Sequence, residues 1–116
     1  MDIESLRRYC LSLPHATEDI QWGNNLLFRV GRKMFAIAAL DQVPVCVSFK
    51  CTPEEFAELI EREGIIPAPY LARNKWVLLK SLDVLPRAEL KRLIKDSYTM
   101  VAAKLPKKVQ SDLGVA

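Results

Sequence analysis

Few residues of this chain suit the binding of a metal ion. It has one histidine, His15, and three cysteines, Cys10, Cys46 and Cys51, none of them in a CxxC pair. Zinc sites need about four such ligands at close spacing, and an odd number of separated thiols gives no disulfide framework. We therefore expect no metal, no cofactor and reduced thiols, which are typical of a cytoplasmic protein.

Long apolar runs and glycine-rich loops are also absent. No run approaches the ~20 apolar residues that a membrane span needs, and the acidic start Met1-Asp2-Ile3-Glu4 is unlike a secretory signal. The four glycines form no phosphate-binding pattern. We expect a monomeric cytoplasmic protein that does not bind membranes. It should fold as a single domain over residues 1–116, with a frayed tail at 107–116.

The most informative part of the sequence is residues 26–50, which read as three consecutive strands. Residues 26–30, 34–40 and 45–50 have the composition of three strands, with reversals at 31–33 and 41–44. Connections this short join antiparallel neighbours, because a parallel neighbour needs a crossover of a dozen or more residues. The sequence therefore predicts an antiparallel meander.

The third of these strands alternates between an apolar and a polar face. Its two sets are Val45, Val47 and Phe49 against Cys46, Ser48 and Lys50. The apolar set predicts the core side of the sheet, and the polar set predicts the opposite side.

Helical periodicity occurs in three stretches, residues 2–13, 53–63 and about 86–104. The second begins at Thr52, which is suited to cap it, with Pro53 as its first helical residue and Glu55 as the acid of a capping box. Of the remaining segments, we expect a polar connection at 14–25, an edge strand or extended loop at 65–71, and a strand at 76–80. The predicted order is α-β-β-β-α-β-β-α, a two-layer α+β domain with an antiparallel sheet.

Positive charge is concentrated in the second half of the chain. Residues 1–65 carry 7 Lys and Arg against 10 Asp and Glu, whereas residues 66–116 carry 10 against 4. A basic half permits a polyanionic partner, but soluble proteins often have such a bias.

Short motifs occur in a fixed order over nearly the whole chain. They are Leu13-Pro14, Glu18-Asp19, Trp22-Gly23, the run 28–36, the run 47–51, the Pro-Ala-Pro-Tyr and Trp elements of 67–76, Ser97-Tyr98, and the run 103–108. In this set the chain resembles the MmcQ/YjbR family of small bacterial proteins, although many relatives have glycine in place of His15 and often of Arg32. The resemblance implies an α-β3-α-β2-α fold of the secretion-chaperone-like type. The family is largely uncharacterised. Its proposed role is DNA binding through two β-hairpin wings, and no catalytic residue is carried over.

Two predicted hairpin tips are the candidate nucleic-acid contacts. Their residues are Arg29, Arg32 and Lys33 at the first and Arg73, Asn74 and Lys75 at the second. Cations at such tips can meet phosphates, and the asparagine can contact a base edge or the sugar–phosphate chain. Basic residues at exposed tips are also routine devices against aggregation, which is the alternative explanation.

Three aromatic residues are candidates for stacking on a base or lining a small-ligand pocket: Trp22, Tyr70 and Trp76. The alternative explanation for these aromatic residues is ordinary packing in the core or at the rim of the sheet. Glu18 and Asp19 lack a histidine or a third carboxylate that would complete a metal or acid–base site, so we expect no enzyme.

The sequence thus favours a weak, mainly backbone-directed DNA-binding module with two basic wings. The alternatives are a protein-interaction or chaperone-like domain and a small-ligand binder.

Overall fold

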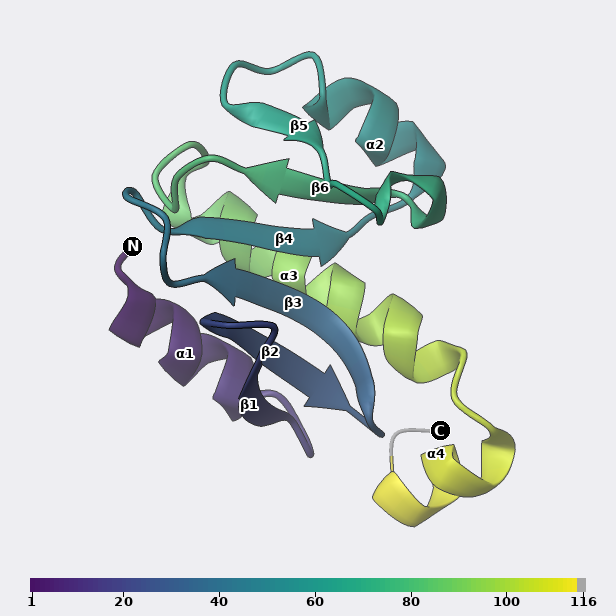
Figure 1. The fold of residues 1–116 in the computed structure, drawn as a ribbon. Helices are drawn as coiled ribbons and strands as arrows, with labels where there is room; N and C mark the ends of the chain where they lie inside the picture. The colour runs from purple at the N-terminus through teal and green to yellow at the C-terminus, as the bar shows by residue number, and fades with distance from the viewer. Residues whose placement is uncertain (115–116) are drawn as a thin grey trace.

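The computed structural model describes residues 1–114 as six strands and five helical segments (Figure 1). The helical segments are α1 (Ile3–Ser12), α2 (Pro53–Leu59), the 3-10 turn η1 (Ala72–Asn74), α3 (Arg87–Ala103) and α4 (Lys107–Leu113). The strands are β1 (Thr17–Gln21), β2 (Asn25–Val30), β3 (Lys33–Ala39), β4 (Cys46–Lys50), β5 (Ile65–Pro67) and β6 (Trp76–Leu79). The two-layer α+β fold class is confirmed.

All six strands form one antiparallel sheet in the order β1-β2-β3-β4-β6-β5. The long helix α3 runs behind the central strands β3 and β4 (Figure 1). Helix α1 lies on the same side, since Lys91 of α3 sits over the ring of Tyr9. The opposite side of the sheet carries no helix among residues 1–114.

The core lies between the sheet and its helices. Phe28, Val47 and Phe49 are fully buried there with Leu90 and Ile94 of α3. Val47 and Phe49 face this core, as the alternation in β4 predicts, whereas Cys46 and Ser48 line a groove on the other side. Successive residues of β4 therefore point to opposite sides of the sheet. One set packs in the core, and the other is accessible for binding.

Helix α2 begins where the sequence predicts. The Thr52 hydroxyl accepts a hydrogen bond from the Glu55 amide at 3.1 Å, and Pro53 stands in the first turn. The helix ends at Leu59, and residues 60–63 continue as turns rather than as the predicted helix.

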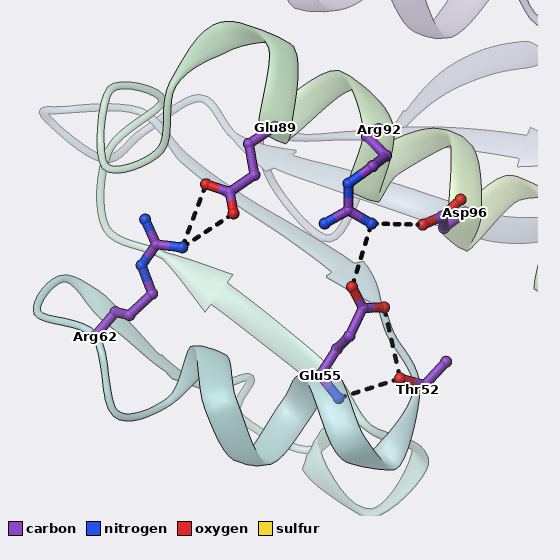
Figure 2. A network of polar contacts seen from close by, with 6 residues as sticks. All are labelled: Thr52, Glu55, Arg62, Glu89, Arg92 and Asp96. Atoms are coloured by element: carbon purple, nitrogen blue, oxygen red, sulfur yellow. Dashed lines mark hydrogen bonds and ion pairs between the residues drawn. The ribbon is translucent and has the colours of Figure 1, made fainter.

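A network of ion pairs joins α2 and the turns after it to α3 (Figure 2). Arg92 reaches Glu55 at 3.3 Å and Asp96 at 3.0 Å, and Arg62 reaches Glu89 at 3.1 Å. Each pair is partly exposed, so it contributes little to stability. The network does, however, place carboxylates next to these two arginines, which reduces the net positive charge on this side of the molecule.

Two elements were not predicted from the sequence. Thr17–Gln21 forms the edge strand β1, although its composition predicts a polar connection. Its polar side chains are used in ion pairs: Glu18 with Arg7 of α1 and Asp19 with Arg29 of β2. An edge strand needs only one paired neighbour, so the usual apolar pattern is weak there.

Of the residues predicted as a frayed tail, 107–113 form α4 and Gly114 caps its end, while the last two lie outside the described residues. The helix is held against the β2–β3 turn. An ideal Cβ on Gly31 would lie 2.6 Å from Leu105 and 3.3 Å from Val109, so Leu105, between α3 and α4, and Val109 of α4 pack closely on that glycine. This contact depends on the folded sheet and has no local sequence pattern.

No helix among residues 1–114 is both long enough and apolar enough to cross a membrane.

Candidate nucleic-acid interface

One end of the sheet brings the two predicted tips to a common surface. The β2–β3 turn and the end of α3 lie on the same side of the molecule (Figure 1). Lys33 from the first tip and Asn74 from the second line one hollow of about 410 Å³, together with Lys50 of β4 and Lys104 after α3. An adjoining hollow of about 470 Å³ shares Lys50, Asn74 and Lys104 and adds Arg73 and Lys75. We call these two hollows together the basic groove.

The first tip is a two-residue turn. Val30 pairs with Lys33, and Gly31 and Arg32 between them have φ angles of 55° and 72°. Positive φ at both central residues is the type I′ pattern that matches the twist of a hairpin. This turn exposes the Arg32 side chain and starts β3 at Lys33, which directs that lysine to the groove.

The second tip is the turn η1 and the residue after it. Lys75 has a φ of 65°, and its amide donates to the carbonyl of Ala72 at 2.9 Å. Lys50 Nζ donates to the carbonyl of Asn74 at 2.9 Å, which ties β4 to this turn. Lys75 Nζ lies over the ring of Phe56 of α2, 5.1 Å from its centre, and Lys75 lines the second hollow.

The charged side chains that line the basic groove are all positive, as are those of a smaller hollow of about 260 Å³ lined by Arg8, Arg87 and Lys91. Neither hollow of the basic groove is lined by an Asp or Glu. Within residues 1–114, none of the groove cations forms an ion pair with a carboxylate, whereas Arg7, Arg29, Arg62 and Arg92 each do. Partial burial and the neighbouring charge of Lys104 lower the pKa of Lys50. An anion in the groove would relieve this repulsion.

Arg29 has a different environment from the other candidates. Its Nε donates to Asp19 at 3.0 Å and its Nη1 to the carbonyl of Arg32 at 2.9 Å. It thereby braces the first tip. Like the exposed Arg32, it lines neither hollow of the basic groove.

Sequence reasoning missed Lys50 and Lys104 as members of the site. A signal for Lys50 was present, because it follows Cys46 and Ser48 on the polar side of β4. Lys104 had none, since only the packing of α3 across the sheet brings its end to Lys50.

The three aromatic candidates divide between two places. Trp22 and Tyr70 line one apolar groove of about 390 Å³ on the side of the sheet away from the helices. We call this the sheet groove. Trp76 is only 5% exposed and lies at the wall of the basic groove beside Lys50.

The acidic and thiol residues singled out in the sequence form no metal site or reactive thiol pair in the part of the chain that the structure describes. Glu18 is engaged by Arg7, and no cluster of three or more metal-ligating side chains occurs within residues 1–114. Burial raises the pKa of the Cys10 thiol to about 12 and that of Cys51 to about 11. Both are therefore protonated at neutral pH and poorly reactive.

Together the fold and this surface define a two-layer α+β domain with one helix-free sheet side and a basic end. The sequence model of the YjbR family matches residues 11–100, and the chain belongs to that family. The resemblance inferred from the sequence is thereby confirmed.

Two solved structures share the fold. The Deinococcus radiodurans protein DR2400, described with the domain DUF419, has a TM-score of 0.89 and 29% identity, with 99% of this chain and 89% of that chain covered. A Pseudomonas syringae protein has a TM-score of 0.71 and 22% identity, with 86% of this chain and 98% of that chain covered. A search of curated proteins gives no match.

Proposed function

We propose that this protein binds nucleic acid through the sugar–phosphate backbone at the basic groove. The observation that carries the proposal is the convergence of the two tips. Lys33 and Asn74, which are 41 positions apart in sequence, line one hollow with Lys50 and Lys104, and no carboxylate lines it. In protein–DNA complexes, most hydrogen bonds from lysine, arginine and asparagine side chains go to phosphate and sugar oxygens.

Binding of this kind is weak and sensitive to salt. Each phosphate neutralised by a lysine or arginine releases condensed counterions, so the logarithm of the affinity falls by about 0.9 per contact for each decade of salt. Five cations meeting five phosphates would give a slope of about −4.5. We expect micromolar or weaker affinity with little sequence preference, since most contacts reach the backbone.

The exposed carboxylates around α2 would repel a polyanion, so they restrict the direction from which it can approach the protein. Glu54, Glu58 and Glu61 are exposed on or just after α2. A polyanion therefore approaches the end of the sheet, between the β2–β3 turn and η1. Nothing in the basic groove suggests a reacting group, and we propose a binding protein without catalytic activity.

Removing the tip cations is expected to weaken duplex binding and to flatten its salt dependence. The variants are Arg32→Gln with Lys33→Gln and Arg73→Gln with Lys75→Gln. If both removed cations contact phosphates, each double should reduce the log–log salt slope by about 1.8. Fluorescence anisotropy of a labelled duplex over a salt series measures the slope, and thermal melts check that the variants fold.

The matched control removes two exposed cations from α3, Arg87→Gln with Lys95→Gln. It lowers the net charge by the same amount, so it reproduces only the loss of long-range attraction. Equal losses in all three doubles would contradict a defined interface. No binding by the unchanged protein at low salt would overturn the proposal, and a protein-interaction role would then be favoured.

A further inference from the structure

The sheet groove lies across three neighbouring strands on the side without helices. Ile37 of β3, Ser48 of β4 and Leu78 of β6 form its floor, and they stand in one row because Ile37 pairs with Ser48 and Ser48 with Leu78. Trp22 enters from the β1–β2 turn and Tyr70 from the segment after β5, at opposite edges of the sheet. The result is an apolar trough to which each edge of the sheet contributes one aromatic ring.

Both aromatic residues are held in an unusual backbone conformation. Trp22 has a φ of 51° and is 64% exposed, and Tyr70 has a φ of 66° and is fully exposed. Bulky residues rarely adopt positive φ, which is costly, and an exposed ring gains little burial in return. Strained backbone conformations cluster at binding and active sites. The two rings therefore have the features of a contact surface for a partner.

The sheet groove continues directly into the basic groove. Leu71 lines both. Along β4, Ser48 of the sheet groove is followed on the same side by Lys50 of the basic groove, about 7 Å away by the rise of a strand. A ligand whose flat apolar part lies in the sheet groove would therefore have its adjoining part beside the lysines of the basic groove. Flat rings joined to regularly spaced anions are the chemistry of a nucleic-acid strand.

We propose that the sheet groove takes the unpaired bases of a single strand, stacked on Trp22 and Tyr70, while the phosphates of that strand lie in the basic groove. This inference rests on the proposed function and makes it more specific. A duplex does not satisfy the site, because its bases stack on one another and present only their edges. In a single strand the base faces are free, and stacking on aromatic side chains tolerates any sequence.

The polar groups of the sheet groove are few, which fits a platform that does not read sequence. Asn25, Ser48 and the weakly hydrogen-bonding thiol of Cys46 are the polar side chains there, apart from the Tyr70 hydroxyl and the Trp22 indole. We expect affinity to follow the stacking strength of the base more than its identity.

The test compares three labelled probes by anisotropy: an oligothymidylate of about 12 nucleotides, an abasic strand of the same length, and a duplex of that length. The unchanged protein should bind the oligothymidylate roughly tenfold more tightly than the abasic strand. Trp22→Ala and Tyr70→Ala should each remove most of this difference and leave abasic binding unchanged. Trp22→Phe keeps a ring and should retain most of it. Leu11→Ala, which removes an exposed apolar side chain from α1, is the control and should change nothing.

A second readout uses the protein without substitution. Cys46 lines the sheet groove and is partly exposed, whereas Cys10 and Cys51 are buried. A bound oligothymidylate should slow the modification of Cys46 by a thiol reagent, and the abasic strand should not.

The possible results separate this inference from the function on which it rests. If both strands bind equally and Cys46 stays accessible, the bases do not occupy the sheet groove; the inference is then overturned and backbone binding stands. The same holds if Trp22→Ala weakens the abasic strand and the duplex as much as the oligothymidylate. If no probe binds, the proposed function fails, and the inference fails with it.

Discussion

Phe49→Ala is expected to lower the free energy of unfolding by about 3–5 kcal/mol, the largest change for one residue that we predict. Phe49 is fully buried in the central strand β4, on the side that faces α3. Alanine would remove a whole ring from a close-packed interior, which loses its transfer free energy and leaves a cavity. Denaturant melts of the two proteins measure the difference.

Val43→Ala is the matched control for this loss. Val43 lies between β3 and β4 and is 97% exposed, so its truncation should change stability by less than about 0.5 kcal/mol. A loss below about 1 kcal/mol for Phe49→Ala would contradict the position of this side chain and with it the register of β4.

Ser97→Ala is expected to cost about 2–4 kcal/mol, a large effect for the loss of one oxygen atom. Ser97 is fully buried in α3. Its hydroxyl donates to the carbonyl of Phe35 at 2.7 Å and accepts from the amide of Lys50 at 3.0 Å, which joins the helix to two strands. Alanine leaves one backbone acceptor and one backbone donor without this partner, and each such loss costs about 1–3 kcal/mol.

The comparison for Ser97 is Thr99→Ala on the same helix. The Thr99 hydroxyl donates to the carbonyl of Lys95 within the helix and is exposed, so its loss should cost under about 0.5 kcal/mol. Because Ser97 holds the backbone of Lys50, Ser97→Ala should also weaken nucleic-acid binding in the folded protein, whereas Thr99→Ala should not. Equal stability for the two variants would contradict the role of Ser97 as the link between the helix and the sheet.

The parts of the fold that were predictable depend on local signals. The meander follows from its short turns and from the alternation in residues 45–50, and α2 follows from the capping box at Thr52. In both, neighbouring residues alone determine the backbone. The edge strand β1 was not predictable, because its pairing with β2 and its ion pairs to Arg7 and Arg29 compensate for a polar composition.

The candidate site was predictable only in pieces. Gly31 at a hairpin turn indicated a basic tip, but nothing local indicated that this tip and η1 share a hollow. Trp22 directly follows the last residue of β1, and Trp76 is the first residue of β6. Only the sheet shows that Trp76 is buried, while Trp22 is exposed with a positive φ. Lys104 reaches the site solely through the length and direction of α3.

The most direct test of the proposed interface is a proton–nitrogen correlation NMR titration of the protein with a short single strand. We predict that amide shifts concentrate at residues 31–34, 48–51, 70–76 and 104, with further shifts near Trp22 if the bases enter the sheet groove. Amides on the outer turns of α1 and α2 should stay unchanged. Shifts confined to those helices, or no shifts at low salt with the strand in excess, would contradict the basic groove as the binding surface.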